Sequence, residues 1–179
     1  SSRLINQINS ATKVALEATD VNPVDSENWM NRGFIHQNLI GLNVGENGDF
    51  AVSMYEEALK LNPANPLAYT RIGNTYVAMA DDAISQSESA GDITELLESA
   101  KTSFQNAIAL YPNYGQALYN LGVVYDRQGD LSRAIAQLEQ LVVTNPRDPS
   151  LAFQIGLLYY RNDQQDNAVA AWEAAVALF

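Results

Sequence analysis

Apolar residues in the stretch 115–148 recur with the period of an α-helix, in two successive stripes. The first stripe consists of Leu118, Leu121, Gly122 and Tyr125. The second stripe consists of Ala134, Leu138 and Leu141. Between them, Gln128-Gly129-Asp130 supplies a turn and an acidic capping residue, and Asn145-Pro146 ends the second helix. The pattern therefore predicts two short amphipathic helices joined by a tight turn.

Helices of this length are unstable in water unless their apolar faces are covered. Each of the two has only one such face, so a single pair cannot bury both of them completely. The arrangement that satisfies both is a stack of similar pairs, in which each pair covers the next. The stretch 115–148 therefore predicts a helical repeat of 34 residues.

The spacing between proline and glycine shows that this unit recurs along the chain. Four glycines each follow a proline by ten residues, and each is followed three residues later by an aromatic residue or histidine. The pairs are Pro23 and Gly33, Pro63 and Gly73, Pro112 and Gly122, and Pro146 and Gly156. The residues three further on are His36, Tyr76, Tyr125 and Tyr159. We interpret glycine as permitting close helix contact and the following ring as filling the gap one turn on.

The repeats predict one array of about nine helices, with an N-terminal half-repeat followed by four repeats. The half-repeat is 3–25, and the repeats are 26–65, 66–114, 115–148 and 149–179. Ser26 is the expected cap of the first full repeat. Both chain ends look cut, which suggests a fragment of a longer protein.

Two repeats are longer than 34 residues, and both insertions fall on the turn side of the unit. In the repeat 26–65, the Gly- and Asn-rich stretch 40–50 predicts an irregular loop, with the helix resuming near Ala51. The repeat 66–114 has about 15 additional residues, which predict two lengthened helices with a break at 85–92. We expect the features specific to this protein at these insertions, 41–49 and 79–92.

Composition excludes several classes of function. Apolar residues make up 47% of the 179 residues, which is typical of a folded domain. The 21 acidic and 10 basic residues give a net charge of −11, so nucleic acid and anionic membranes are poor partners. No apolar run approaches the length of a membrane span, which argues against membrane insertion of this segment. The chain has no cysteine and one histidine, so disulfides are excluded and a zinc site would need mostly carboxylate ligands, which is rare.

No catalytic constellation is found, so the sequence predicts neither an enzyme nor a cofactor or metal site. His36 stands where the other repeats have tyrosine, and we interpret it as a packing residue. The segment 45–49, GENGD, lacks the alternating acidic ligands of a calcium loop and is better interpreted as a turn. Neighbouring acids such as Asp81 and Asp82 point in different directions on a helix and predict solvated surface.

The repeat resembles the tetratricopeptide repeat family. The family pattern has Trp, Leu-Gly and Tyr in the first helix, Ala, an aromatic residue and a second Ala in the second, and a closing Pro. The residues on these positions are Trp29, Leu121, Gly122, Tyr125, Ala134, Ala58 and Pro146. Leu141 departs from the pattern, as does His36. The resemblance implies an all-α, right-handed superhelix of helix pairs and a protein-interaction role.

The resemblance also implies which residues line the concave groove, because certain positions of each first helix face the ligand in this family. The groove set implied in this way is Met30, Phe34, Gln37, Asn38, Thr70, Asn74, Tyr119, Val123, Asp126, Arg127, Phe153, Leu157 and Tyr160. These residues are notably apolar and aromatic, which favours an extended peptide or a helix as ligand. The alternative is that some of them pack beneath the long helices of the repeat 66–114.

One subset of the family grips a C-terminal carboxylate with lysines, asparagines and an arginine at fixed groove positions. Met30 and Gln116 stand where the lysines would be, so the sequence disfavours a carboxylate-gripping adaptor. A second resemblance is to the repeat tails of bacterial O-antigen-ligase-like membrane proteins. It implies a place beside a glycan polymerase or ligase, in the cell envelope; a cytoplasmic location is the alternative.

Three functions therefore stay open at this point: a peptide-binding scaffold, the soluble part of a membrane glycan-assembly protein, and a self-assembling structural subunit. The last hypothesis depends on the final helix, whose apolar residues have no following repeat to cover them. Those residues are Val169, Trp172, Val176 and Phe179.

Overall fold

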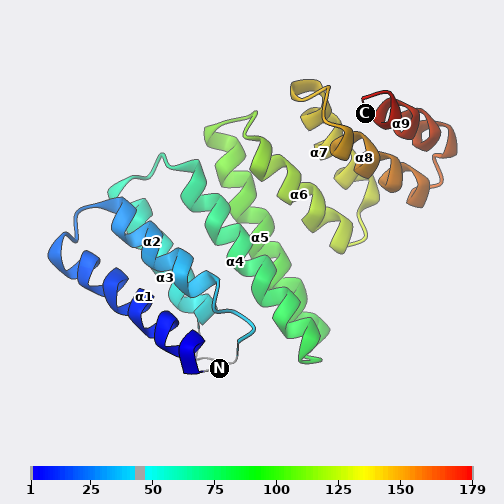
Figure 1. Ribbon diagram of the computed structural model, residues 1–179. Helices are drawn as coiled ribbons and strands as arrows, with labels where there is room; N and C mark the ends of the chain where they lie inside the picture. The colour runs from blue at the N-terminus through cyan, green and yellow to red at the C-terminus, as the bar shows by residue number, and fades with distance from the viewer. Residues whose placement is uncertain (1, 43–46, 179) are drawn as a thin grey trace. The chain divides into compact units, whose positions relative to one another are not determined.

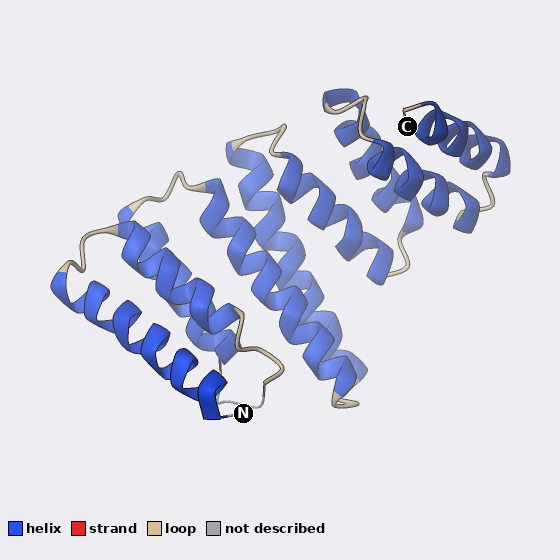
Figure 2. Ribbon diagram, in the orientation of Figure 1, coloured by secondary structure: helices blue, strands red, loops and turns tan. Residues whose placement is uncertain are grey.

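The computed structural model describes residues 2–42 and 47–178, and within these residues it contains nine α-helices and no strand (Figures 1 and 2). The helices are α1 Ser2–Val21, α2 Ser26–Gln37, α3 Asn47–Leu61, α4 Pro66–Ser85, α5 Ala90–Leu110, α6 Gly115–Arg127, α7 Leu131–Thr144, α8 Pro149–Arg161 and α9 Gln165–Ala177. The all-α fold class and the helix pairs expected from the sequence are confirmed.

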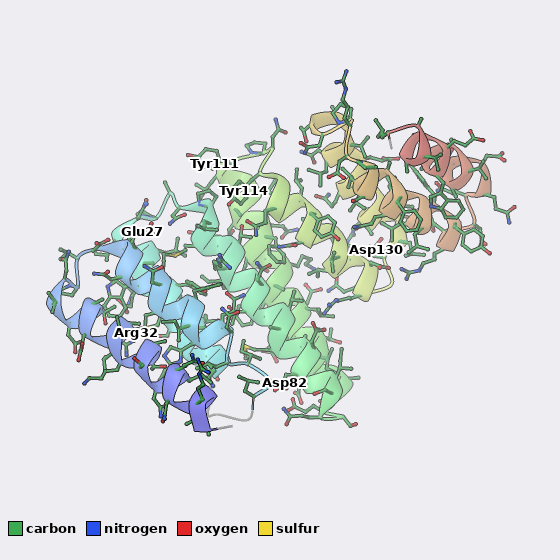
Figure 3. The ribbon with its side chains drawn as sticks, in the orientation of Figure 1. Glu27, Arg32, Asp82, Tyr111, Tyr114 and Asp130 are labelled. Atoms are coloured by element: carbon green, nitrogen blue, oxygen red, sulfur yellow. The ribbon has the colours of Figure 1, made fainter. Side chains whose placement is uncertain are left out.

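Acidic and amide side chains cap several helices and determine where they start. The carboxylate of Asp130 accepts a hydrogen bond from the backbone N–H of Arg133 (3.1 Å), as predicted for the turn before α7 (Figure 3). Asn65 and Asp148 cap α4 and α8 in the same way. The cap of α2 is Asp25, and Ser26 is already the first helical residue, so that prediction is corrected by one position.

The helices form two compact units, Ser1–Leu110 with α1 to α5 and Tyr111–Phe179 with α6 to α9, and each is described by itself. In the first unit every helix packs on the next one along the chain (Figure 1). Its core contains Ala51, Tyr55, Ala58 and Ala68, whose side chains are completely buried. Arg32 joins α2 to α1 by donating a hydrogen bond to the Thr19 hydroxyl (3.0 Å; Figure 3).

In the second unit, α6 pairs with α7, and α8 pairs with α9. The stripes predicted for the stretch 115–148 form its core: Leu118, Leu121, Gly122, Tyr125, Ala134, Leu138 and Leu141 are all buried. Ala117 and Ala134 are fully buried, and their small side chains allow neighbouring helices to approach closely. Whether the repeats continue as one array past Leu110 stays a prediction.

The four glycines of the proline–glycine spacing lie where the two helices of each pair are in contact. Each lies against a large side chain from the second helix of its own pair, and this side chain occupies the space that a Cβ would need. The contacts are Gly33 with Tyr55, Gly73 with Phe104, Gly122 with Leu138 and Gly156 with Trp172. The sequence interpretation assigned this gap to the ring three residues after the glycine, and the structure corrects that assignment.

The insertions predicted from the sequence lengthen the helices on the turn side. Helices α4 and α5 have 20 and 21 residues, against 13 and 14 in α6 and α7, so the two lengthened helices are confirmed. The break between them is short, because α5 begins at Ala90. In the repeat 26–65, α3 begins at Asn47 rather than near Ala51, and residues 43–46 of the expected loop lie outside the described residues.

Candidate functional site

The first candidate surface lies in the second unit, where α6 and α8 run next to each other. A shallow cavity of about 90 Å³ opens between these helices. Its lining is Tyr119, Gly122, Val123, Asp126, Leu138, Gln154, Leu157, Leu158 and Arg161. Three of the residues that the family pattern assigns to a groove in α6, namely Tyr119, Val123 and Asp126, line this cavity together with Leu157 of α8.

Two polar bridges hold the walls of this cavity at a defined distance. The Tyr119 hydroxyl donates a hydrogen bond to Oε1 of Gln154 at 2.7 Å. Nη1 of Arg161 lies 2.7 Å from Oδ1 and 2.8 Å from Oδ2 of Asp126, and the ion pair raises the pKa of Arg161. Both bridges join residues 35 positions apart, one on each helix. The surface is therefore organised before any ligand binds, which reduces the entropic cost of binding.

Next to this cavity, α8 exposes three large apolar side chains at helical spacing. Phe153, Leu157 and Tyr160, named here the apolar stripe, are 57%, 44% and 56% exposed. Their spacing of four and three residues places them on one face of the helix. The backbone carbonyl of Phe153 accepts a hydrogen bond from the Trp172 indole (3.2 Å), which ties the stripe to α9. Large apolar side chains gathered in this way are typical of a binding surface.

In the first unit, the groove residues of α2 form a smaller surface. The Phe34 ring is 44% exposed, and the guanidinium of Arg71 from α4 lies 4.5 Å from its centroid, a cation–π contact. Gln37 accepts a hydrogen bond from the buried Tyr55 hydroxyl (2.8 Å), and Asn38 donates to the Phe34 carbonyl (2.6 Å). Gln37 and Asn38 are therefore partly engaged in holding the end of α2.

Two residues of the predicted groove set lie in the core instead. Met30 is only 6% exposed and packs with Ala51 and Val52. Thr70 is completely buried, and its hydroxyl donates to the Pro66 carbonyl (2.8 Å). Neither side chain is available to a ligand, so both leave the candidate set. Of the remaining members, Asn74 and Val123 are half-buried and Arg127 is exposed.

No group of three or more metal-ligating side chains is found among residues 2–42 and 47–178. His36 is half-buried, with its Nδ1 3.0 Å from Oδ1 of Asn47 and its ring 5.7 Å from that of Phe50. No helix in the described part of the chain is long and apolar enough to cross a membrane.

The last helix differs from its predicted state in one respect. Val169 and Val176 are 51% and 73% exposed, as expected from the sequence. Trp172, expected on the same exposed face, is half-buried against Gly156 of α8. Its ring lies 6.0 Å from that of Tyr160. Phe179 lies outside the described residues.

Sequence reasoning missed a second kind of surface, which lies between the second helices of neighbouring repeats. In the second unit a groove of about 440 Å³ runs between α7 and α9, over α8. It is lined by Glu139, Val142, Val143, Ala152, Ile155, Tyr159, Asn167, Ala170, Ala171 and Ala174. At its edge the Tyr159 hydroxyl donates to Oε1 of Glu139 (2.6 Å). Tyr159, three residues after Gly156, is the residue of the repeat pattern that could have indicated this groove from the sequence.

The Tyr159 bond predicts a measurable dependence on pH. Burial, and then the hydrogen bond to Glu139, raises the pKa of Tyr159 to about 12. Since the pKa of tyrosine is about 10 in unfolded chains, the folded state favours the neutral phenol. This contribution to stability is complete below about pH 10 and is lost as the pH rises towards about 12. The ultraviolet titration curve of Tyr159→Phe, subtracted from that of the wild type, isolates the ionisation of Tyr159. Its midpoint should lie at about pH 12. A midpoint at about pH 10, the ordinary tyrosine value, would contradict the buried, hydrogen-bonded phenol.

Comparison with known proteins agrees with this geometry. A family model described as tetratricopeptide repeat matches residues 95–152 and 124–179. The chain is 29% identical over 147 residues to the general transcriptional corepressor trfA of Dictyostelium discoideum, covering 81% of this chain and 9% of that protein. It is 31% identical over 121 residues to the photosystem I assembly protein Ycf3 of Prochlorococcus marinus, covering 58% and 66% respectively. The chain thus spans less than two thirds of the length of these relatives.

Two solved structures show the same fold. A crystal structure of MamA has a TM-score of 0.75 and 21% identity, covering 98% of this chain and 91% of that chain. The thermophilic TPR protein TTC0263 of Thermus thermophilus has a TM-score of 0.70 and 22% identity, covering 98% and 85%.

The recurring helix pairs, the glycine contacts and these likenesses define a protein of the helical-repeat class. More particularly, residues 95–179 belong to the tetratricopeptide repeat family, and the described residues of the whole chain have the fold of its members.

Proposed function

We propose that this chain is a non-catalytic protein–protein interaction scaffold that binds a peptide segment or helix of another protein on the α6–α8 surface. The observation that carries the proposal is the apolar stripe of Phe153, Leu157 and Tyr160, which lies beside a cavity braced by two polar bridges. Exposed aromatic anchors next to a preorganised hollow are the usual source of affinity in peptide recognition. The Asp126–Arg161 pair at the cavity offers one charge of each sign to the peptide.

The relatives support an interaction role without naming a ligand for this chain. The Prochlorococcus relative is named a photosystem I assembly protein, and the Dictyostelium relative is named a general transcriptional corepressor. The chain's own surface suggests a ligand with at least one large apolar side chain, because the stripe offers mainly apolar contacts from Phe153, Leu157 and the ring of Tyr160. The glycan-assembly role, the cell-envelope location and self-assembly through α9 stay predictions.

The proposal is tested by selecting peptides from a displayed random library against the wild-type chain and measuring their affinity for variants. Phe153→Ala with Leu157→Ala should weaken a selected peptide by a factor of about 10 or more, since anchors of this type contribute about 1–2 kcal/mol each. Both side chains are exposed, so circular dichroism should report unchanged helicity.

The matched control is Val143→Ala, which changes an apolar residue that is 81% exposed and lines the α7–α9 groove instead. It should leave the affinity unchanged. If the selected peptides bind the double variant as well as the wild type, the α6–α8 surface is not the binding site. If Val143→Ala alone weakens binding, the site lies in the α7–α9 groove.

A further inference from the structure

A groove in the first unit corresponds at most of its lining positions to the α7–α9 groove but differs in chemistry. It has a volume of about 410 Å³ and runs between α3 and α5, over α4. We name it the α3–α5 groove. Its lining is Glu56, Leu59, Tyr69, Ile72, Tyr76, Glu95, Glu98, Ser99, Thr102, Ser103 and Asn106. All three helices belong to the first unit, so the groove is complete within it.

The floor of the α3–α5 groove is apolar and firmly supported. Ile72 is buried in the core of the unit, and Leu59 and Tyr76 pack against that core while remaining partly open to the groove. Tyr69, also half-buried, adds a second aromatic ring from the same helix. A floor of this kind accepts apolar side chains and the alkyl stems of long basic residues. The tyrosine rings can also interact with a cation.

The walls of the same groove are acidic. Glu56 rises from α3, and Glu95 and Glu98 rise from α5; all three are exposed. Glu98 is paired with Lys101, which leaves two carboxylates in excess in the lining. The field of these acids reaches the floor: burial raises the pKa of Tyr76, and the charges of Glu56 and Asp49 raise it further. A cation entering the groove therefore meets negative charge from both sides.

Comparison of the two grooves indicates that the acidic wall belongs to the lengthened repeat. When the repeat glycines are aligned, Glu56, Ile72 and Tyr76 correspond to Glu139, Ile155 and Tyr159. Along the other wall, Thr102, Ser103 and Asn106 replace three alanines of α9. Glu95 and Glu98 line only the α3–α5 groove, near the start of the longer helix α5.

We propose that the α3–α5 groove binds a basic amphipathic helix of another protein, with its lysine or arginine side chains between Glu56 and Glu95 and its apolar face on the tyrosine floor. Charge complementarity selects this occupant. A second copy of the chain is disfavoured because each copy carries a net charge of −11. This site is distinct from the α6–α8 surface, so the chain would hold two different segments at once.

The test uses a synthetic amphipathic helix of about five turns, with lysine on one face and leucine on the other, and a matched peptide with glutamate in place of lysine. Fluorescence anisotropy should show binding of the basic peptide only, weakening as the salt concentration rises. Glu95→Gln with Glu98→Gln should weaken it by about three- to tenfold, as expected for the loss of partly exposed charge contacts.

The control variant is Asp163→Asn with Asp166→Asn, at the aligned positions before and within the first turn of α9. This variant removes the same amount of negative charge from the chain, and neither of its two residues lines the α3–α5 groove or the α7–α9 groove. Asparagine tolerates the positive φ of 58° at Asp163. The proposal is supported if only the Glu95/Glu98 variant loses affinity, while Phe153→Ala with Leu157→Ala binds normally. Equal losses in both charge variants, no loss in either, or no binding by the wild type would overturn it.

Discussion

Replacing Phe104 by alanine should remove about 3–5 kcal/mol from the stability of the first unit, the usual cost of deleting a buried aromatic side chain. Phe104 is completely buried and fills the space that Gly73 leaves on α4. The variant loses both the apolar burial and the contact that joins α4 to α5. Since domains of this size are stable by roughly 5–15 kcal/mol, a large part of the stability of the unit depends on this ring.

Urea denaturation followed by circular dichroism would measure the loss, and hydrogen exchange would show whether α4 and α5 lose protection first. Phe50→Ala is the control, because that ring is 53% exposed and its removal should cost less than about 1 kcal/mol. Similar midpoints for the two variants would mean that Phe104 does not hold the pair together.

Gly73→Ala should be the second most destabilising change, by about 1–3 kcal/mol, although alanine is ordinarily the better helix former. A Cβ at this position would lie 2.5 Å from Cε1 of Phe104, so the ring or the helix backbone must shift. The glycine is required by close approach between α4 and α5, and its helical conformation is otherwise ordinary.

The matched control is Gly91→Ala, in the first turn of α5, where the nearest atom to a Cβ is Oγ of Ser89 at 3.7 Å. There the substitution should be neutral or stabilising by up to about 1 kcal/mol, through helix propensity alone. Thermal denaturation of the two variants separates the explanations. A stabilising Gly73→Ala would show that the contact is loose and would contradict the packing described for all four repeats.

The helix pairs were predictable because their signals are local. Proline ends one helix, and glycine marks the helix contact ten residues later. The apolar residues of each helix recur with the period of an α-helix. The same reasoning placed Leu118, Leu138 and Leu141 in the core correctly. Helix starts were less accurate. Asp25 rather than the neighbouring Ser26 caps α2, and α3 begins at Asn47, before the predicted Ala51.

The candidate site was only partly predictable. A position in the repeat indicates on which face of a helix a residue lies, but not how deeply its side chain is buried. Met30 and Thr70 occupy groove positions of the family pattern, yet neighbouring residues bury them. Trp172 is half-buried for a similar reason, since Gly156 leaves space for its ring. The α3–α5 groove was missed because its walls come from helices of two different repeats. The hydrophobic pattern of a single helix does not show which helix of the next repeat lies beside it.

The most direct test of the central claim, that the apolar stripe is the peptide-binding surface, is photo-crosslinking from a single position. A photoreactive phenylalanine analogue at Leu157, which is 44% exposed within the stripe, should crosslink to a peptide selected against the wild-type chain. The same analogue at Val143, in the α7–α9 groove, should not. Crosslinking from Val143 and none from Leu157 would contradict the account.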